Sequence, residues 1–306
     1  LAIFDDVDIH NIRRGADPLE AVLAKRLVQA GTQLDSDALG DPQLVADLQH
    51  QLGETLENLG HSAAAADLLA QALKTRGQGL GEDHPRTLDT MNRLALAYRS
   101  TGKLEQALPL FEETLRRRKK ALGIEHADTL TSMVNLAGAY ALAGQLDKVL
   151  PLYEEAHERM TNTLGADHLH TLGCKNNLAL AYQEAGQGDK TLALLEQTFK
   201  LAKARLGPNH PNTLTSMNNL AVAYRDAGQV TTALQLLRET LDRRKKVLGA
   251  DHPDTLLSMG QLAGGHWAAG KSEQAIALQK EVVRLSQAKL GLYHPATVSA
   301  MSNLGL

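Results

Sequence analysis

Hydrophobic positions along most of the chain recur at helical spacing, in pairs of stripes that are separated by a glycine. In residues 82–123 the first stripe consists of Leu88, Met91, Leu94, Ala95 and Tyr98. After Gly102 the second stripe consists of Leu104, Ala107, Leu108, Phe111 and Leu115. This spacing is typical of amphipathic helices, and a glycine between two such stripes favours a turn. The pattern therefore predicts a helical hairpin.

The segment between hairpins also recurs. "LGEDHP" starts at Leu80, and related segments start at Leu122, Leu164, Leu206, Leu248 and Leu290, each 42 residues after the one before. Local turn preferences place no constraint on residues that lie so far away, so this spacing indicates an architectural repeat. We expect Gly81 to end one helix, Asp83 or His84 to cap the next, and Pro85 to lie in its first turn.

The turn and one core position follow the same period. The Gly102 position recurs at Gly60, Gly144, Gly186, Gly228 and Gly270, and the Tyr98 position at Tyr140, Tyr182 and Tyr224, with His266 in the next copy.

Two kinds of departure from the repeat occur at helix starts. Ala127 and Leu169 replace the joint proline, so we expect those helix starts to fray or shift. Pro109 and Pro151 lie about one turn inside a second helix, where we expect a bend or a late helix start.

These patterns divide the chain into three parts. Residues 1–40 are expected to form an N-terminal segment with a capping helix in "ADPLEAVLAKRLVQAGTQL", opened by Asp17 and Pro18. Residues 41–289 are expected to form tandem hairpin repeats, the first of them degenerate and started by Asp41 and Pro42. Residues 290–306 are expected to begin a further repeat or to form a trailing capping helix. The chain starts at Leu1 without a methionine or a signal pattern, so we expect it to be a fragment.

Composition favours an all-α protein. Hydrophobic residues make up 43% of the chain but aromatic residues only 3%, and a balance met largely by alanine and leucine suits close helix packing. A net charge of −3 gives no field that would gather nucleic acid or an anionic membrane. Cys174 is the only cysteine, as expected in a reducing, cytoplasmic compartment. No apolar run is long enough to span a membrane.

The landmarks of the repeat resemble a known family. The order of Leu94, Ala95, Tyr98, Gly102, Ala107 and Phe111 is similar to the tetratricopeptide repeat. The 42-residue length, the "LGxDHPxTL" joint and "NNLA" at residues 176–179 and 218–221 resemble the kinesin light chain subfamily, including its bacterial members. The resemblance covers about residues 40–306 and implies an α-α superhelix, the tetratricopeptide repeat solenoid.

Catalytic and metal-binding patterns are missing from the sequence. Histidines repeat once per joint, at His84, His126, His168, His210, His252 and His294. Packed helices lie about 8–10 Å apart, whereas zinc ligands converge to about 2 Å from one ion, so we expect these histidines to cap helices. His168 and His170 are closer together but lack further ligands. No Gly-rich phosphate loop, H-E-x-x-H or G-x-S-x-G occurs, so we expect no enzyme activity, metal or cofactor.

Two basic runs, at residues 116–120 and 243–246, end second helices. Such runs can bind polyanions. Cations at a helix C-terminus also interact favourably with the helix dipole. We therefore interpret both runs as solvated helix ends.

One polar register on the first helices is the candidate binding site. It contains Arg93, Asn135, Asn177, Asn219, Gln261 and Asn303. The resemblance implies that this register faces the concave groove of the superhelix. An amide both donates and accepts, so a ladder of amides could pair with the backbone of an extended peptide. Alternatively, these amides bond neighbouring helices within the stack.

Neighbouring positions extend this candidate site. One position earlier lie Asn92, Asn176 and Asn218, and one turn later lie Arg99, Gln183, Arg225 and Trp267. Arg93, Arg99 and Arg225 could select acidic groups through paired hydrogen bonds. Small residues such as Gly138 and Gly264 leave gaps that aromatic anchors of a ligand could fill.

The sequence therefore predicts a non-catalytic scaffold that binds an extended peptide or protein partner, and the resemblance implies an acidic motif. Two alternatives stay open. Bacterial kinesin light chain proteins of this repeat type accompany bacterial tubulins, so the chain could be a cytoskeletal accessory that binds tubulin filaments. The segment around "DPLEAVLAKRLVQAG" is similar to the entry of repeat regions in bacterial Ser/Thr kinases, so the chain could be the C-terminal regulatory arm of such a kinase. The terminal helix could also mediate homo-oligomer formation.

Overall fold

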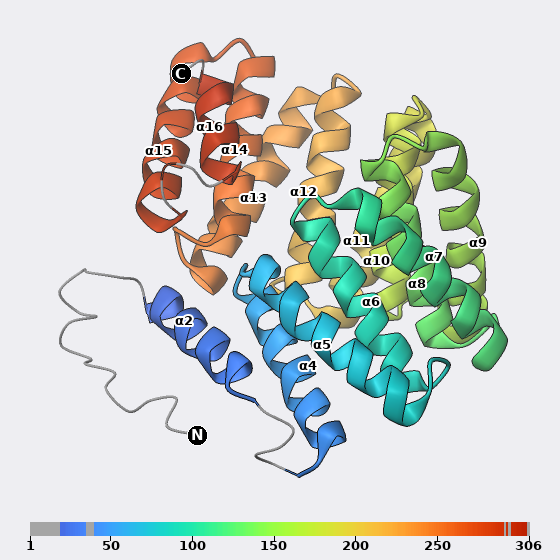
Figure 1. Cartoon of the computed structure of the whole chain (residues 1–306). Coiled ribbons are helices and arrows are strands. Elements are labelled where there is room, and N and C mark those ends of the chain that lie inside the picture. The colour runs from blue at the N-terminus through green and yellow to red at the C-terminus, as the bar shows by residue number, and fades with distance from the viewer. Residues whose placement is uncertain (1–18, 35–39, 291, 293–294, 305–306) are drawn as a thin grey trace. The chain divides into compact units, whose positions relative to one another are not determined.

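The computed structural model describes residues 19–34, 40–290, 292 and 295–304. Every regular element in these ranges is a helix (Figure 1). Their bounds are α2 Leu19–Thr32, α4 Pro42–Asn58, α5 Ser62–Leu80, α6 Pro85–Ser100, α7 Leu104–Ala121, α8 Ala127–Leu142, α9 Leu146–Leu164, α10 Leu169–Glu184, α11 Gly188–Leu206, α12 Pro211–Asp226, α13 Val230–Leu248, α14 Pro253–Ala268, α15 Ser272–Leu290 and α16 Pro295–Leu304. Asp17, Pro18 and the segment before them lie outside the described residues.

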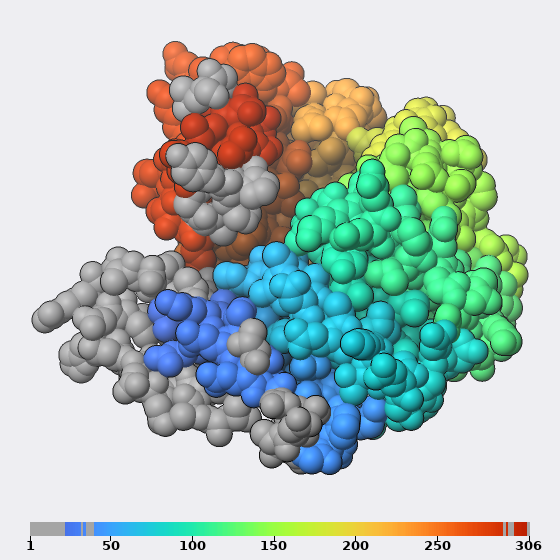
Figure 2. Space-filling view, viewed as in Figure 1, coloured from blue at the N-terminus to red at the C-terminus, as the bar shows by residue number. Residues whose placement is uncertain are grey.

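The chain forms two compact units, Leu1–Leu152 and Tyr153–Leu306, and the division falls inside α9. In the first unit each helix from α4 to α8 packs on the next, and α2 lies against α4 and α5. The space-filling view shows α5 and α6 packed side by side (Figure 2). In the second unit each helix from α10 to α16 packs on the next in the same way. This sequential packing is the arrangement of a helical-repeat solenoid.

First helices of consecutive hairpins also contact one another directly. This holds for α4, α6 and α8 in the first unit and for α10, α12 and α14 in the second. Second helices make fewer contacts with one another than first helices do. Side chains on neighbouring first helices of one unit can therefore act together on one ligand.

Histidine caps start the first helices. In five consecutive joints the histidine Nδ1 accepts a hydrogen bond from the backbone N–H two residues later, at 3.2 Å for His84, 3.2 Å for His126, 3.3 Å for His168, 3.1 Å for His210 and 3.1 Å for His252. His294 lies outside the described residues. The capping role expected for these histidines is thus seen at each joint that the structure describes.

The shift expected at Ala127 and Leu169, and the late helix start expected near Pro109 and Pro151, are not seen. α8 begins at Ala127 and α10 at Leu169, in register with the helices that begin at Pro85, Pro211 and Pro253. The histidine cap is present at these two joints as well and holds the first turn without proline. α7 and α9 likewise begin in the common register, at Leu104 and Leu146, although Pro109 and Pro151 lie inside them. A late start would expose Ala107, which is fully buried.

The interpretation of the basic runs as solvated is wrong for two residues. Arg118 and Arg244 are only 3% and 2% exposed. Each guanidinium reaches the next first helix. Arg118 Nη1 donates to the Asp128 carbonyl at 3.0 Å and to Ser132 Oγ at 2.9 Å. A guanidinium has five N–H donors, so one side chain can tie several groups of the next hairpin to the end of the previous one. Lys119, Lys120, Lys245 and Lys246 are exposed, as expected.

None of the described helices is long and apolar enough to cross a membrane. Among the same residues, no group of three or more His, Cys, Asp or Glu side chains is arranged to hold a metal ion.

Candidate functional site

The candidate register lies on the first helices, as expected from the sequence. Its residues Arg93, Asn135, Asn177, Asn219 and Gln261 lie on α6, α8, α10, α12 and α14, and all five are half-buried. Asn303 on α16 is exposed. A half-buried polar side chain is held by its neighbours and still reaches solvent, which suits a ligand contact.

In the first unit the register is largely paired within the protein. Arg93 Nη2 lies 2.7 Å from Glu54 Oε1. Asn135 Nδ2 donates to Asn92 Oδ1 at 3.1 Å. Burial raises the pKa of the Glu57 carboxyl above its ordinary value of 4.5, and the charges of Arg93 and Arg99 offset this only in part. These arginines therefore already face acidic groups of α4.

In the second unit the two adjacent amide positions differ. Asn176 and Asn218 are buried. Asn176 Nδ2 donates to Ser216 Oγ at 2.9 Å, and Asn218 Oδ1 accepts from Ser258 Oγ at 3.2 Å. These two amides join neighbouring first helices, which is the alternative role that the sequence left open.

The amides of Asn177 and Asn219 are available to bind a ligand. Both are half-buried, and neither side chain has a hydrogen-bond partner among the residues that the structure describes. Each amide therefore keeps its donor and acceptor for a ligand. α10 and α12 touch directly, so these two amides lie on neighbouring helices.

Arg225 and Gln261 continue the register on the C-terminal side. Arg225 Nη1 donates to Gln261 Oε1 at 3.2 Å, and Arg225 Nε donates to Asp226 Oδ1 at 2.9 Å. Gln183 donates to the other carboxylate oxygen of Asp226. Trp267, one turn beyond Gln261, is 64% exposed. A carboxylate ligand would meet Arg225 in competition with Asp226.

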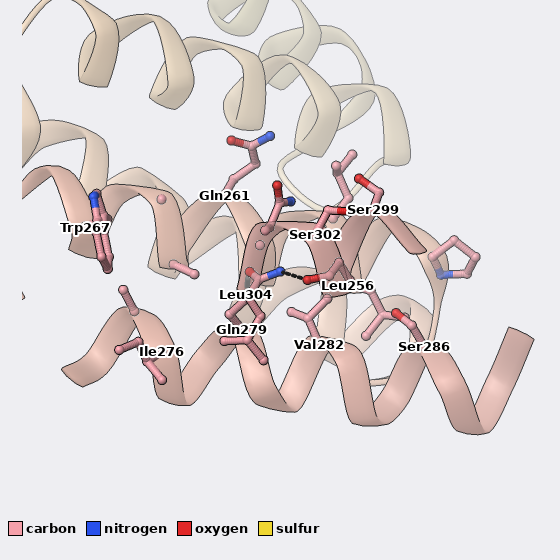
Figure 3. Close-up of a pocket in the computed structure, with 18 of the residues that line it drawn as sticks. Leu256, Gln261, Trp267, Ile276, Gln279, Val282, Ser286, Ser299, Ser302 and Leu304 are labelled. Atoms are coloured by element: carbon pink, nitrogen blue, oxygen red, sulfur yellow. Dashed lines mark hydrogen bonds between the residues drawn. The ribbon is translucent and has the colours of Figure 1, made fainter. Parts of the chain in front are cut away.

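A cavity of about 830 Å³ lies beside these residues, between α14, α15 and α16 (Figure 3). Trp267 and Ile276 lie at one end in Figure 3 and Ser286 and Ser299 at the other. Gln279 Nε2 crosses to the Ala300 carbonyl at 2.9 Å and joins α15 to α16. The sequence pattern does not indicate this cavity, although Gly264, which is expected to leave a gap in the groove, does line it.

A comparison with protein families agrees with the repeat geometry. The tetratricopeptide repeat family matches residues 44–120, 90–162, 128–187, 171–246 and 219–288. This chain is a tetratricopeptide repeat protein. Proteins of this family generally bind proteins or peptides. No curated protein matches the tetratricopeptide repeat protein described here.

Solved structures place this tetratricopeptide repeat protein near kinesin light chain-like repeats. The nearly identical TPR-like repeats of a candidate kinesin light chain from Podosopora anserina share 32% identity, with a TM-score of 0.56, over 68% of this chain and 98% of that one. BtubC (BKLC) from P. vanneervenii has the same fold at 20% identity and a TM-score of 0.60, over 75% of this chain and 92% of that one.

A third structure of the same fold contains a bound peptide. NprR in complex with its cognate peptide NprX matches with 14% identity and a TM-score of 0.62, over 85% of this chain and 72% of NprR. At this identity the match shows a common fold. It does not assign the peptide to this tetratricopeptide repeat protein.

Proposed function

We propose that this protein is a non-catalytic scaffold that binds an extended segment of a partner protein across α10, α12 and α14. Asn177 and Asn219 carry this proposal, because each has an unpaired amide on a first helix that touches the next. Gln261 continues the row on α14. In the first unit Arg93 and Asn135 hold the same register but are already paired.

The spacing of the helices suits an extended ligand. Packed helices lie about 8–10 Å apart, and an extended chain advances about 3.3 Å per residue. Successive first helices would therefore meet about every third residue of the ligand. Amides that pair with the ligand backbone accept many side chains, so specificity must come from other groups nearby.

Charge would supply part of that specificity. Arg225 lies within the row in the second unit, and an acidic ligand group could displace Asp226 from its guanidinium. Exchange of one carboxylate for another at a partly exposed site changes affinity little, but a basic ligand group there would be disfavoured. The complex of NprR with its cognate peptide supports peptide binding by this fold in general terms.

The test is a selection of binders from a library of displayed linear peptides, followed by measurement of Kd by fluorescence anisotropy. The double substitution Asn177→Ala with Asn219→Ala removes the unpaired amides. The matched control is Gln197→Ala with Gln235→Ala, which removes two exposed amides from the second helices α11 and α13. We expect the ladder variant to bind at least about tenfold more weakly, since each hydrogen bond contributes about 0.5–1.5 kcal/mol. Equal Kd values for the wild type and the ladder variant would overturn the proposal.

A second candidate is the cytoskeletal accessory that binds bacterial tubulin filaments. The fold shared with BtubC makes this candidate worth testing. Co-sedimentation with polymerised bacterial tubulin checks it. Equal co-sedimentation of the wild type and the Asn177→Ala, Asn219→Ala variant would favour a filament contact outside the amide row.

A further inference from the structure

We infer that the cavity between α14, α15 and α16 binds an apolar side chain of the peptide ligand, of about the size of methionine. The inference rests on the proposed function, because the cavity continues the amide row at Gln261 and Arg225, which both line it. The amide row by itself does not specify a side chain of the ligand, and the cavity specifies an apolar one.

The corresponding space one repeat earlier is filled by a buried polar network. Arg244 Nη1 donates to Ser258 Oγ at 2.8 Å, and Arg244 Nη2 donates to Thr215 Oγ1 at 3.1 Å. Ser258 Oγ in turn donates to Asn218 Oδ1 at 3.2 Å. The long guanidinium side chain occupies the space between α12, α13 and α14 and bonds groups on each side.

All four members of this network are replaced 42 residues later. Ser286 stands for Arg244, Ala300 for Ser258, Leu257 for Thr215 and Gly260 for Asn218. These four replacements all line the cavity. The cavity therefore lies where a large side chain and its polar partners have been exchanged together for small or apolar residues.

Another joint of the second unit shows what fills such a space when it is apolar. There Met160 holds the position of Arg244, and Cys174 holds the position of Ser258. Both are only 1% exposed. The thioether side chain is flexible and fills irregular apolar gaps well. At the last joint Ser286 is too short to do so, and a methionine, leucine or phenylalanine side chain of a ligand would fill the space instead.

The opening of the cavity is apolar, and the described residues that line the cavity carry charge of one sign, which is positive. Leu257, Trp267 and Ile276 line the cavity and are 52%, 64% and 41% exposed. Among the described lining residues, Arg225 is the only charged one. This composition favours an apolar anchor that is followed by a neutral or acidic group, and it disfavours a lysine. A volume of about 830 Å³ has room for the anchor and its flanking backbone.

Trp267 provides the readout for an experiment that uses the full chain. It is the only tryptophan in the sequence and lies at the cavity opening. The probe is N-acetyl-L-methionine, and N-acetyl-L-lysine serves as the polar control with the same carboxylate. We expect a saturable change in Trp267 emission with the methionine probe and at least about tenfold weaker binding of the lysine probe, because burial of an apolar side chain of this size favours binding and burial of an ammonium group opposes it.

Substitutions of cavity residues test whether the probe binds in the cavity. Ser286→Met fills the space from within, as Met160 does, and should weaken binding of the methionine probe at least about tenfold. Lys246→Met, an exposed position on α13 outside the cavity lining, is the control and should leave binding unchanged. Gly260→Met fills the cavity from α14, where an added Cβ meets no atom within 4 Å, and provides a second test if Ser286→Met folds poorly. Circular dichroism checks the fold of each variant.

The outcomes separate this inference from the proposed function. No saturable signal in the wild type, equal binding of the two probes, or unchanged binding by both filled variants would overturn the inference. An emission change that depends on protein concentration alone, and is lost in Ser286→Met, would show that a second copy of the chain occupies the cavity and would overturn it too. The Asn177→Ala, Asn219→Ala variant should bind the methionine probe normally, so failure of the amide row leaves this measurement intact.

Discussion

Arg244 Nη1 donates a hydrogen bond to Ser258 Oγ at 2.8 Å, and this contact ties the end of α13 to the next first helix. Arg76 and Thr90 make the equivalent contact at 2.6 Å, and Arg118 and Ser132 make it at 2.9 Å. The arginine and its hydroxyl partner therefore form one unit of the repeat. Where the arginine is missing, its position holds Met160, Ala202 or Ser286, and the cavity lies beside Ser286.

The first prediction concerns stability at this joint. Arg244→Ala removes a fully buried side chain and should lower the free energy of unfolding by about 2–4 kcal/mol. Arg244→Met combined with Ser258→Ala fills the space with an apolar side chain, as at Met160, and should cost less than half as much. Urea unfolding followed by circular dichroism measures both. Equal losses for the two variants would show that the filled volume does not matter at this joint.

The second prediction concerns the histidine caps. His210 Nδ1 accepts from the Asn212 backbone N–H at 3.1 Å at the start of α12. His210→Ala removes this acceptor and should lower the free energy of unfolding by about 0.5–2 kcal/mol. His210→Asn supplies another acceptor and should therefore lose only a small fraction of that free energy. The same urea titration reports the loss, and indistinguishable alanine and asparagine variants would contradict the capping role.

The third prediction concerns a charged residue in the core of the second unit. Lys175 is 5% exposed and holds the repeat position of Met91, Met133, Met217 and Met259. Burial lowers the pKa of its amine below the ordinary 10.5. Lys175→Met should stabilise the protein by about 1–3 kcal/mol because it removes the desolvation cost of the ammonium group. The exposed Lys200→Met is the control and should change stability little.

The fourth prediction concerns the dependence of stability on pH. Burial, followed by the charge of Lys175, lowers the pKa of His157 below its ordinary value of 6.5. The unfolded chain therefore takes up a proton at this residue at a higher pH than the folded chain does. The folded state favours the neutral form of His157, so the free energy of unfolding should fall as the pH drops through about 6.5 and below. Thermal unfolding between about pH 5 and about pH 8, where histidine titrates, should show a shallower decline for His157→Leu than for the wild type. An unchanged slope would contradict the assignment to His157.

The sequence was sufficient for the repeat and for much of each hairpin. Tyr98, Gly102 and His84 recur with the same period, because turn, cap and core positions must return together in every copy of a stacked unit. The glycine at each turn has a positive φ, for example 74° at Gly102 and 78° at Gly228, and this conformation strains residues with a Cβ. Single departures such as Ala127 and Pro109 do not shift the helix start, because the neighbouring cap and the buried stripe hold it.

The site required the tertiary structure. Asn176 and Asn177 are adjacent and chemically identical, and only the packing of α10 against α12 decides that the first is buried and bonded and the second is available. The sequence likewise placed Arg244 in a basic run typical of solvated helix ends, whereas its partners lie on other helices. A repeat period specifies which residues occupy equivalent positions. Some of those side chains form hydrogen bonds within the protein, and others remain available to a ligand. Atoms of neighbouring helices decide between the two, and the residue pattern of a single helix does not contain those atoms.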